Sequence, residues 1–164
     1  MEIKIREFHP GDEAAFRRLN EEWITRYFVL EAKDSYSLEH PQEAILDGGG
    51  RIFLAFDGNE AVGCCALMAL APGEFEVAKM AVTETRQGFG IGRKLLQHVV
   101  DEAEASGATR LYLETNQKLV TAITLYESLG FRHLRREEIT PSPYARANVY
   151  MERRAPILIS SPPE

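Results

Sequence analysis

The segment at residues 74–105 restricts the fold of this chain more than any other part of it. The apolar stretch EFEVAKMAV is typical of a strand, the turn TETRQGFGIG is rich in glycine, and RKLLQHVVDEAEA is typical of an amphipathic helix. Glycines leave the backbone open to close approach by a ligand. The first N–H groups of a helix have no partner within the helix, and the helix dipole favours negative charge there. The segment therefore predicts a binding site for a phosphate or pyrophosphate.

The helix of this segment has one apolar face at helical spacing, formed by Gly92, Leu95, Leu96, Val99 and Ala103. Two common nucleotide-binding loops do not fit the turn before it. A P-loop requires GxxxxGK followed by Ser or Thr, which the turn lacks. The dinucleotide fingerprint GxGxxG fails because Arg93 or Leu95 stands at its third glycine position.

The turn does fit the pattern Gln/Arg-x-x-Gly-x-Gly/Ala, through Gln87, Gly90 and Gly92. This pattern resembles the coenzyme A pyrophosphate loop of the GNAT family of N-acetyltransferases. Further along the chain, LYLETN and AITLYESLGF are similar to the next strand and helix of that family, so the resemblance extends over about residues 52–131. A glycine turn that merely joins a strand to a helix is the alternative.

Length and charge exclude several classes of protein. A chain of 164 residues is long enough for one domain with a substantial core. Its net charge of −6 argues against a general binder of nucleic acid or acidic membranes. No apolar run approaches the ~20 residues of a membrane span, and the first residues lack the apolar core of a signal peptide. We expect a cytoplasmic protein without nucleic-acid or membrane partners.

The potential metal ligands show no binding pattern. Cys64 and Cys65 are the only cysteines, and neighbours on a strand point to opposite faces, so they cannot form a metal pair. We expect no framework disulfide. We expect both in the core or at its edge. No ligand spacing relates the histidines, which are His9, His40, His98 and His133. We expect no metal.

The hydrophobic pattern predicts alternating strands and helices along residues 1–155, with a loosely held tail at 156–164. The predicted strands are 3–8, 51–56, 61–70, 74–82, 109–114, 131–135 and 148–152. Helices are expected after Asp12, which can cap the first of them, after Pro41, after the glycine turn, and before Gly130. Residues 29–38 are expected to form a loop.

Short turns join the three strands within 51–82, so these strands should form an antiparallel meander. A helical crossover leads to the strand at 109–114, which should therefore lie parallel to the strand at 74–82. The prediction is one mixed α/β domain. It has the GNAT acyl-CoA N-acyltransferase fold that the resemblance implies: a mostly antiparallel sheet of about seven strands, with helices on both faces.

The resemblance implies that the parallel strands ending at Val82 and Thr115 separate and hold acetyl-CoA between them. The pyrophosphate would bind the amides of the glycine turn, and the pantetheine amides would pair with the free strand edge. The implied cofactor-binding residues are Met80, Ala81, Val82, Gln87, Gly88, Phe89, Gly90, Ile91, Gly92, Arg93, Asn116 and Tyr126. The position of Asn116 departs from the family pattern, because many family members have an asparagine three residues later, where this chain has Leu119.

The resemblance also implies three catalytic roles. An alkylamine is mostly protonated at neutral pH, so a general base is needed, and Glu76 matches that position. The N–H of Met80, or of a neighbour, would stabilise the developing oxyanion. Tyr126 would act as general acid toward the leaving thiolate. The alternatives are that Glu76 simply points to solvent and that Tyr126 only packs in the core.

The acceptor side implied by the resemblance comprises about residues 20–36 and 141–148. The candidate substrate-binding residues are Trp23, Tyr27, Phe28, Tyr144 and Arg146. An aromatic pocket with Arg146 suits a small amine that carries a carboxylate. Four acidic side chains could equally receive a cationic amine: Glu21, Glu22, Glu31 and Asp34. Trp23 and Tyr27 could instead be core residues of an amphipathic helix.

The sequence thus predicts transfer of an acetyl group from acetyl-CoA to a primary amine by direct attack. The expected acceptor is a small molecule, either an amino acid or a polyamine-like compound. Alternatives are a protein or peptide acceptor, a non-catalytic acyl-CoA sensor, and, with least support, a charged tRNA. A homodimer stays open, because members of the family often pair through edge strands.

Overall fold

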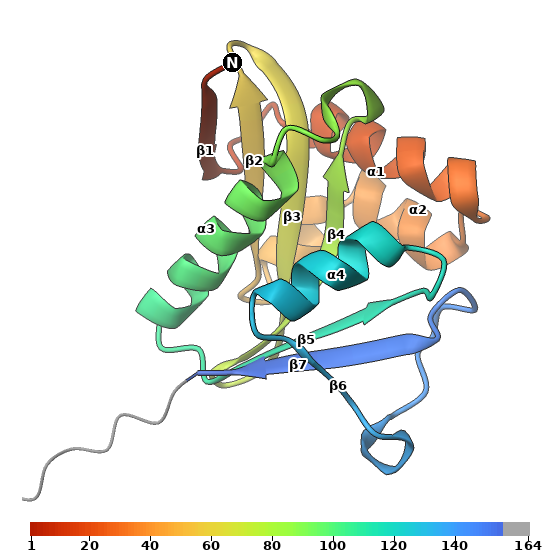
Figure 1. The fold of residues 1–164 in the computed structure, drawn as a ribbon. Coiled ribbons are helices and arrows are strands. Elements are labelled where there is room, and N and C mark those ends of the chain that lie inside the picture. The colour runs from red at the N-terminus through yellow and green to blue at the C-terminus, as the bar shows by residue number, and fades with distance from the viewer. Residues whose placement is uncertain (156–164) are drawn as a thin grey trace, which may run out of the picture.

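The computed structural model describes residues 1–155, and its strands form one mixed sheet in the order β1-β2-β3-β4-β5-β7-β6 (Figure 1). The strands are β1 (Ile3–Glu7), β2 (Arg51–Asp57), β3 (Glu60–Ala71), β4 (Glu74–Val82), β5 (Arg110–Thr115), β6 (Arg132–His133) and β7 (Val149–Arg154). All neighbours pair antiparallel except β4 and β5, which are parallel. The predicted mixed, mostly antiparallel sheet is confirmed. The tail predicted at 156–164 lies outside the described residues.

The four α-helices are α1 (Glu13–Tyr27), α2 (Ala32–Glu39), α3 (Ile91–Ala105) and α4 (Val120–Ser128). Single helical turns also occur at Gln42–Leu46, where the helix predicted after Pro41 is in the π form, at Glu84–Arg86 and at Arg136–Glu138. Within residues 1–155, no helix combines the length and the apolarity needed to cross a membrane.

The sheet separates two hydrophobic cores, and α3 and α4 cover one face while α1 and α2 cover the other (Figure 1). The alternation of side chains along a strand produces this division. Phe53 of β2 belongs to the α3/α4 core and Leu54 to the α1/α2 core, and neither is exposed. Cys65 and Cys64 divide in the same way, so the prediction of buried neighbours on opposite faces is confirmed.

The parallel strands β4 and β5 pair over only a short length. Their register begins at Glu74↔Arg110 and ends at Glu76↔Tyr112, although β4 continues to Val82 and β5 to Thr115. The two strands therefore part beyond Glu76, as the family resemblance implied. From there on, the side of β4 that faces β5 has no strand paired to it among the described residues.

Just beyond this parting, β4 contains a β-bulge. Between the pairs Cys64↔Ala81 and Ala66↔Ala78, β4 has two residues, Lys79 and Met80, where β3 has only Cys65. Lys79 adopts a left-handed conformation with φ of 51°. Such an extra residue shifts the alternation of the strand, so every later side chain changes face.

The prediction of a loop at residues 29–38 is wrong, because α2 occupies most of it. The side chain of Glu31 and that of Asp34 each accept a hydrogen bond from the other's backbone N–H, which forms a capping box. The helix then buries Asp34 and Ser37 beside Leu38. Since two of these inward residues are polar, the hydrophobic pattern gave no helical signal.

Two smaller predictions also fail. Asp12 does not cap α1 through its side chain, because its carboxylate accepts hydrogen bonds from the Arg6 guanidinium at 2.7 and 3.1 Å and from His9 N at 2.7 Å. The strand predicted at 131–135 is reduced to Arg132–His133 at the edge of the sheet. The hydrophobic pattern could register neither the pairing of Asp12 with Arg6, six residues earlier, nor the shortness of this edge strand.

Gly50, at the entrance to β2, provides a test of the packing on the α1/α2 face. A Cβ at Gly50 would lie 2.5 Å from Leu67 O and 2.6 Å from Ile45 O, whereas at Gly48 the nearest atom would be 3.9 Å away. We expect Gly50→Ala to lower the free energy of unfolding by about 1–3 kcal/mol. Gly48→Ala should change it by less than about 0.5 kcal/mol. Urea unfolding of both variants measures this, and equal stabilities would contradict the described packing.

Candidate active site

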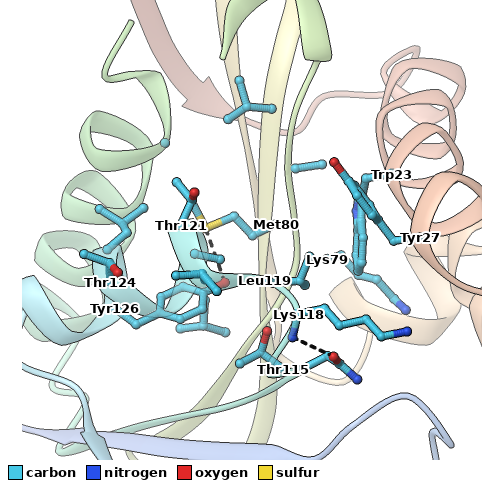
Figure 2. Close-up of a pocket in the computed structure, with 18 of the residues that line it drawn as sticks. Trp23, Tyr27, Lys79, Met80, Thr115, Lys118, Leu119, Thr121, Thr124 and Tyr126 are labelled. Carbon is cyan, nitrogen blue, oxygen red and sulfur yellow. Dashed lines mark hydrogen bonds between the residues drawn. The ribbon is translucent and has the colours of Figure 1, made fainter. Parts of the chain in front are cut away.

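A cavity of about 730 Å³ lies where β4 and β5 part. It runs from the glycine turn, along β4 and between α1 and α4, to the segment before β7, and Figure 2 shows many of its lining residues. Every predicted catalytic and cofactor-binding residue, and each of the five candidate substrate-binding residues, lines this cavity except Phe89, which is 65% exposed. The cavity also has charged lining residues that sequence reasoning missed: Lys79, Arg86, Glu114 and Lys118.

The glycine turn contributes unpaired backbone N–H groups to one end of the cavity. Gly88 and Gly90 have φ of 85° and 78°, a region that glycine enters at little cost, and Gly90 is the N-cap of α3. The first backbone N–H of α3 with a partner among residues 1–155 is that of Lys94, which donates to Gly90 O at 3.1 Å. The N–H groups before it are free to bind an anion.

Two side chains hold this turn in place. Gln87 Nε2 donates to Val82 O at 3.0 Å, so the turn is tied to the end of β4. Arg93 Nη2 donates to Ser128 Oγ at 2.7 Å and thereby connects α3 to α4. Both residues line the cavity, so the predicted contacts of Gln87 and Arg93 with a cofactor would be made in addition to these.

The bulge directs Met80 toward Tyr126. Before the bulge, Val77 points into the α3/α4 core; after it, Met80 and Val82 pack against that same core, and Ala81 lies in the other. Tyr126 OH consequently lies 4.0 Å from Met80 Sδ (Figure 2). A thioether is a weak acceptor, so the hydroxyl can turn to a better one.

Tyr126 both packs in the core and lines the cavity. Only 9% of the residue is exposed, and its ring lies 5.9 Å from that of Phe131. Burial raises the pKa of the Tyr126 phenol above its usual range, so the hydroxyl stays neutral and can donate a hydrogen bond. The two alternatives for Tyr126, core packing and access to the site, are thus compatible.

Glu76 lines the cavity from the last paired position of β4 and is only partly exposed. Its burial, together with the negative charge of Glu114, raises the pKa of Glu76 to about 7, and the nearby Lys79 opposes this shift. Glu114 in turn accepts hydrogen bonds from Tyr112 OH at 2.8 Å and from Ser142 Oγ at 2.7 Å. A carboxyl group with a pKa near neutrality is suited to act as a general base.

Aromatic residues from α1 form the opposite side of the cavity (Figure 2). Trp23 and Phe28 meet edge to face, with ring centroids 6.3 Å apart. Tyr27 is 46% exposed, so it is not a core residue, whereas Trp23 is partly exposed and also packs against the α1/α2 core. Trp23 therefore contributes to both the core and the cavity.

Asp34, Lys79 and Arg146 form an ion cluster beneath this side of the cavity. Arg146 donates to both oxygens of Asp34 at 2.7 Å, and Lys79 Nζ lies 2.7 Å from Asp34 Oδ1. Asp34 is completely buried. Although burial would raise its pKa, the hydrogen bonds from Arg146 and Lys79 lower the pKa of Asp34 to about 2.

The carboxylates proposed as sites for a cationic amine have other partners. Asp34 is paired with Lys79 and Arg146, and Glu31 lies 3.4 Å from Arg146 Nη1. Glu22 accepts from Thr83 Oγ1 at 3.1 Å and from Glu84 N at 2.8 Å, and Glu21 pairs with Arg17 at 2.8 Å. None of these four carboxylates lines the described cavity, so that alternative is not supported.

Asn116 is engaged by the protein itself. Its Nδ2 donates to Arg146 O at 2.6 Å and its Oδ1 accepts from Lys118 N at 2.9 Å, so it fastens the end of β5 to the segment before β7. A contact with pantetheine would have to use the remaining hydrogen or lone pair. Leu119 presents an apolar side chain at the position where many family members have asparagine.

A model of the acetyltransferase (GNAT) family matches residues 16–131. The IAA acetyltransferase of Azospirillum brasilense is 40% identical over 82 residues, which is 49% of this chain and 54% of that protein. The [ribosomal protein bS18]-alanine N-acetyltransferase of Salmonella typhimurium is 36% identical over 78 residues, 48% of this chain and 53% of that one. The chain spans about half the length of the curated relatives it matches.

Solved structures share the complete fold. A GNAT-family acetyltransferase from Staphylococcus aureus superimposes with a TM-score of 0.83 at 23% identity, over 93% of this chain and 99% of that one. At this identity the likeness concerns the fold alone.

The raised pKa of Glu76 predicts a pH-dependent effect on stability. The pKa of Glu76 is about 7 in the folded protein and near its ordinary value of 4.5 when unfolded, so its favourable contribution is complete below the unfolded pKa and is lost as pH rises through about 7. Glutamine at this position stays neutral. We therefore expect the Tm of Glu76→Gln to rise relative to wild type between about pH 5 and about pH 8.

Differential scanning fluorimetry at several pH values measures this effect. Glu74→Gln, two residues earlier on β4 and outside the cavity lining, is the matched control and should show no such trend. Glu114→Gln should move the midpoint of the trend to lower pH, because it removes the charge that opposes ionisation of Glu76. A Tm difference that is constant with pH would show that Glu76 is not held in a raised-pKa environment.

Proposed function

The chain belongs to the GNAT family of acetyltransferases, and we propose that it transfers an acetyl group from acetyl-CoA to a primary amine. One observation carries this proposal. A single cavity contains free N–H groups at the glycine turn, an unpaired strand edge, a carboxyl group with a pKa near neutrality and a neutral phenol. These are the groups that acetyl transfer from a thioester requires.

The donor would lie along β4. Its pyrophosphate would accept hydrogen bonds from the N–H groups at Gly88, Gly90 and Gly92, and its pantetheine amides would pair with the free edge of β4 from Val82 toward Met80. The thioester then reaches the bulge. There the N–H of Met80 would polarise the carbonyl, and Tyr126 would lie beside the sulfur.

In the reaction, the neutral amine attacks the thioester carbonyl carbon. A C–N bond forms, the C–S bond breaks, the nitrogen gives up a proton as the amide forms, and CoA leaves as a thiol after the thiolate gains one. Glu76 would receive the proton of the amine, directly or through water. A thiol has a pKa of ~8.5, and burial raises the pKa of the Tyr126 phenol well above that, so Tyr126 would stabilise the thiolate chiefly as a hydrogen-bond donor.

The burial of both cysteines supports direct attack of the amine on the thioester. Cys64 and Cys65 are completely buried and do not line the cavity. Burial raises the pKa of the Cys64 thiol to about 12, which keeps it in the unreactive thiol form. An acetyl-cysteine intermediate therefore has no suitable nucleophile among the described residues.

The proposed acceptor is a small primary amine that carries a carboxylate, such as an amino acid. Trp23 and Tyr144 supply aromatic surface, and the Arg146 guanidinium lies 5.8 and 4.5 Å from their ring centroids. Arg146 has five N–H donors, and those not used by Asp34 and Glu31 could bind an acceptor carboxylate. An acceptor of this kind would present its amine toward Glu76.

A peptide acceptor is the second candidate. The relative from Salmonella is named for an alanine of a ribosomal protein. In this chain, exposed apolar and aromatic side chains lie where α1 passes into α2, namely Tyr27, Val29 and Tyr36. They could contact a peptide on either side of its reacting amine.

A thiol-release assay with acetyl-CoA and a panel of amino acids, polyamines and peptides tests the proposal. In Tyr126→Phe only the hydroxyl is lost, so kcat should fall by about 10- to 100-fold while acetyl-CoA still raises the Tm. Unchanged kcat in this variant would remove the proposed role of Tyr126. Stabilisation by acetyl-CoA with no turnover of any acceptor would favour a non-catalytic sensor.

The glycine turn has its own test. Gly90→Ala and Gly107→Ala both place a side chain at a positive φ, 78° and 89°, with no neighbouring atom within 4 Å. Each should cost about 1 kcal/mol of stability. Only Gly90→Ala alters the proposed pyrophosphate site, so only it should reduce the rise in Tm that acetyl-CoA causes. Equal ligand-induced shifts in the two variants would contradict the assignment of the turn.

A further inference from the structure

Lys79 has a backbone conformation that requires an explanation. Its φ of 51° makes it the only residue other than glycine with positive φ within residues 1–155. A non-glycine side chain in the left-handed region is strained and persists only where the surroundings impose it. The residue lies in the bulge, directly before Met80 and beyond the last pair of β4 with β5.

Both ends of Lys79 are fixed. Its ammonium lies 2.7 Å from Asp34 Oδ1 and 4.9 Å from the centre of the Tyr144 ring, and only 7% of its side chain is exposed. Its carbonyl oxygen accepts a hydrogen bond from Cys64 Sγ at 3.3 Å. These contacts come from α2, from the segment before β7 and from β3, so three separate parts of the chain converge on one residue.

Asp34 is itself rigidly held. In addition to Lys79, it accepts two hydrogen bonds from Arg146 and one from Glu31 N at 3.0 Å in the cap of α2. A buried ion pair contributes little net stability, because desolvation of the charges offsets their attraction. Its effect here is geometric: it fixes the direction of the Lys79 side chain, and with it the backbone from which that side chain projects.

The bulge determines which groups meet at the parting of β4 and β5. In an unbroken strand, Met80 would face the same side as Glu76, because side chains alternate with a period of two. The extra residue reverses this, so that Met80 faces Tyr126 across the α3/α4 side while Glu76 remains on the other. The orientation of the Met80 N–H depends on the same local conformation.

We propose that Lys79 and Asp34 are positioning residues, whose buried ion pair holds the bulge in the conformation that presents the Met80 N–H to the thioester. The role in catalysis rests on the proposed acetyl transfer. The claim that the ion pair fixes the conformation of the bulge does not rest on it, because that claim concerns the backbone of β4 in the protein without ligand.

Lys79→Gly and Lys79→Ala form a matched pair that tests this inference. Both variants lose the ammonium and leave Asp34 paired with Arg146, but only glycine adopts positive φ without steric cost. With the best acceptor from the thiol-release panel, we expect kcat of Lys79→Ala to be about tenfold below that of Lys79→Gly. Asp34→Asn, which keeps the side-chain shape but weakens the anchor, should lower kcat; because Asp34 also holds Arg146, the acceptor KM of this variant does not discriminate, and its Met80 resonance is the readout.

A second readout does not depend on turnover. In ¹⁵N-labelled protein without an acceptor, addition of acetyl-CoA, which carries the thioester carbonyl, should shift the Met80 amide resonance in wild type and Lys79→Gly but much less in Lys79→Ala. This separates the inference from the proposed function, because a protein that binds acetyl-CoA without turnover would still show the pattern. If Lys79→Ala does not fold, the Met80 resonance is measured in Asp34→Asn instead. A reduced shift is expected there, and a shift equal to that of wild type would overturn the inference.

Two results with the Lys79 pair would also overturn it. If both variants retain wild-type kcat and a wild-type Met80 shift, the ion pair has no positioning role. If both lose activity equally, and the loss is a raised acceptor KM, the ammonium binds the acceptor instead of holding the bulge.

Discussion

The parting of β4 and β5 is the constraint on which the rest of the site depends. A strand inside a sheet satisfies its backbone groups on both sides, but β4 loses its neighbour after Glu76. The exposed edge is a liability in most proteins, because it invites pairing with other chains. Here the edge lines a cavity between helices, where an extended ligand can pair with it. Because the glycine turn lies at the end of the same strand, its free N–H groups give such a ligand a second anchor, one that binds an anionic group.

The two faces of the sheet divide the chemistry. On the α3/α4 face, apolar packing surrounds Tyr126 and keeps its hydroxyl neutral. On the α1/α2 face, charges are buried in pairs, and Glu76 is the exception whose pKa is raised. Separation of a neutral donor from a titrating carboxyl group suits a reaction in which one proton is removed and another delivered at different atoms. The sheet thus keeps the carboxyl group of Glu76 and the hydroxyl group of Tyr126, which we propose act on different atoms, on opposite sides of the same opening.

Much of this arrangement could be predicted from the sequence because its signals are local. The strand, glycine turn and helix at residues 74–105 are contiguous, and their order alone indicates an anion site beside a strand end. The features that the sequence did not predict depend on polar contacts between residues far apart in the chain. Asp34 looked like a loop residue because its partners, Lys79 and Arg146, are 45 and 112 positions away. The bulge at Lys79 and Met80 contains no glycine, so the sequence AKMAV gives no local signal for it. The roles assigned to Glu76 and Tyr126 stay predictions, although both line the cavity.

The donor side of the cavity consists largely of backbone. The free N–H groups of the turn and the edge of β4 require glycine at a few positions and an open strand, but they hardly depend on which side chains surround them. The side that we propose for the acceptor is built from individual side chains, such as Trp23, Tyr144 and Arg146. Substitutions on the proposed acceptor side that leave the cluster of Asp34, Lys79 and Arg146 intact can therefore accumulate without disturbing the donor side. A protein built in this way can change its substrate over evolutionary time while keeping its cofactor, and its acceptor will be easier to redesign than its donor.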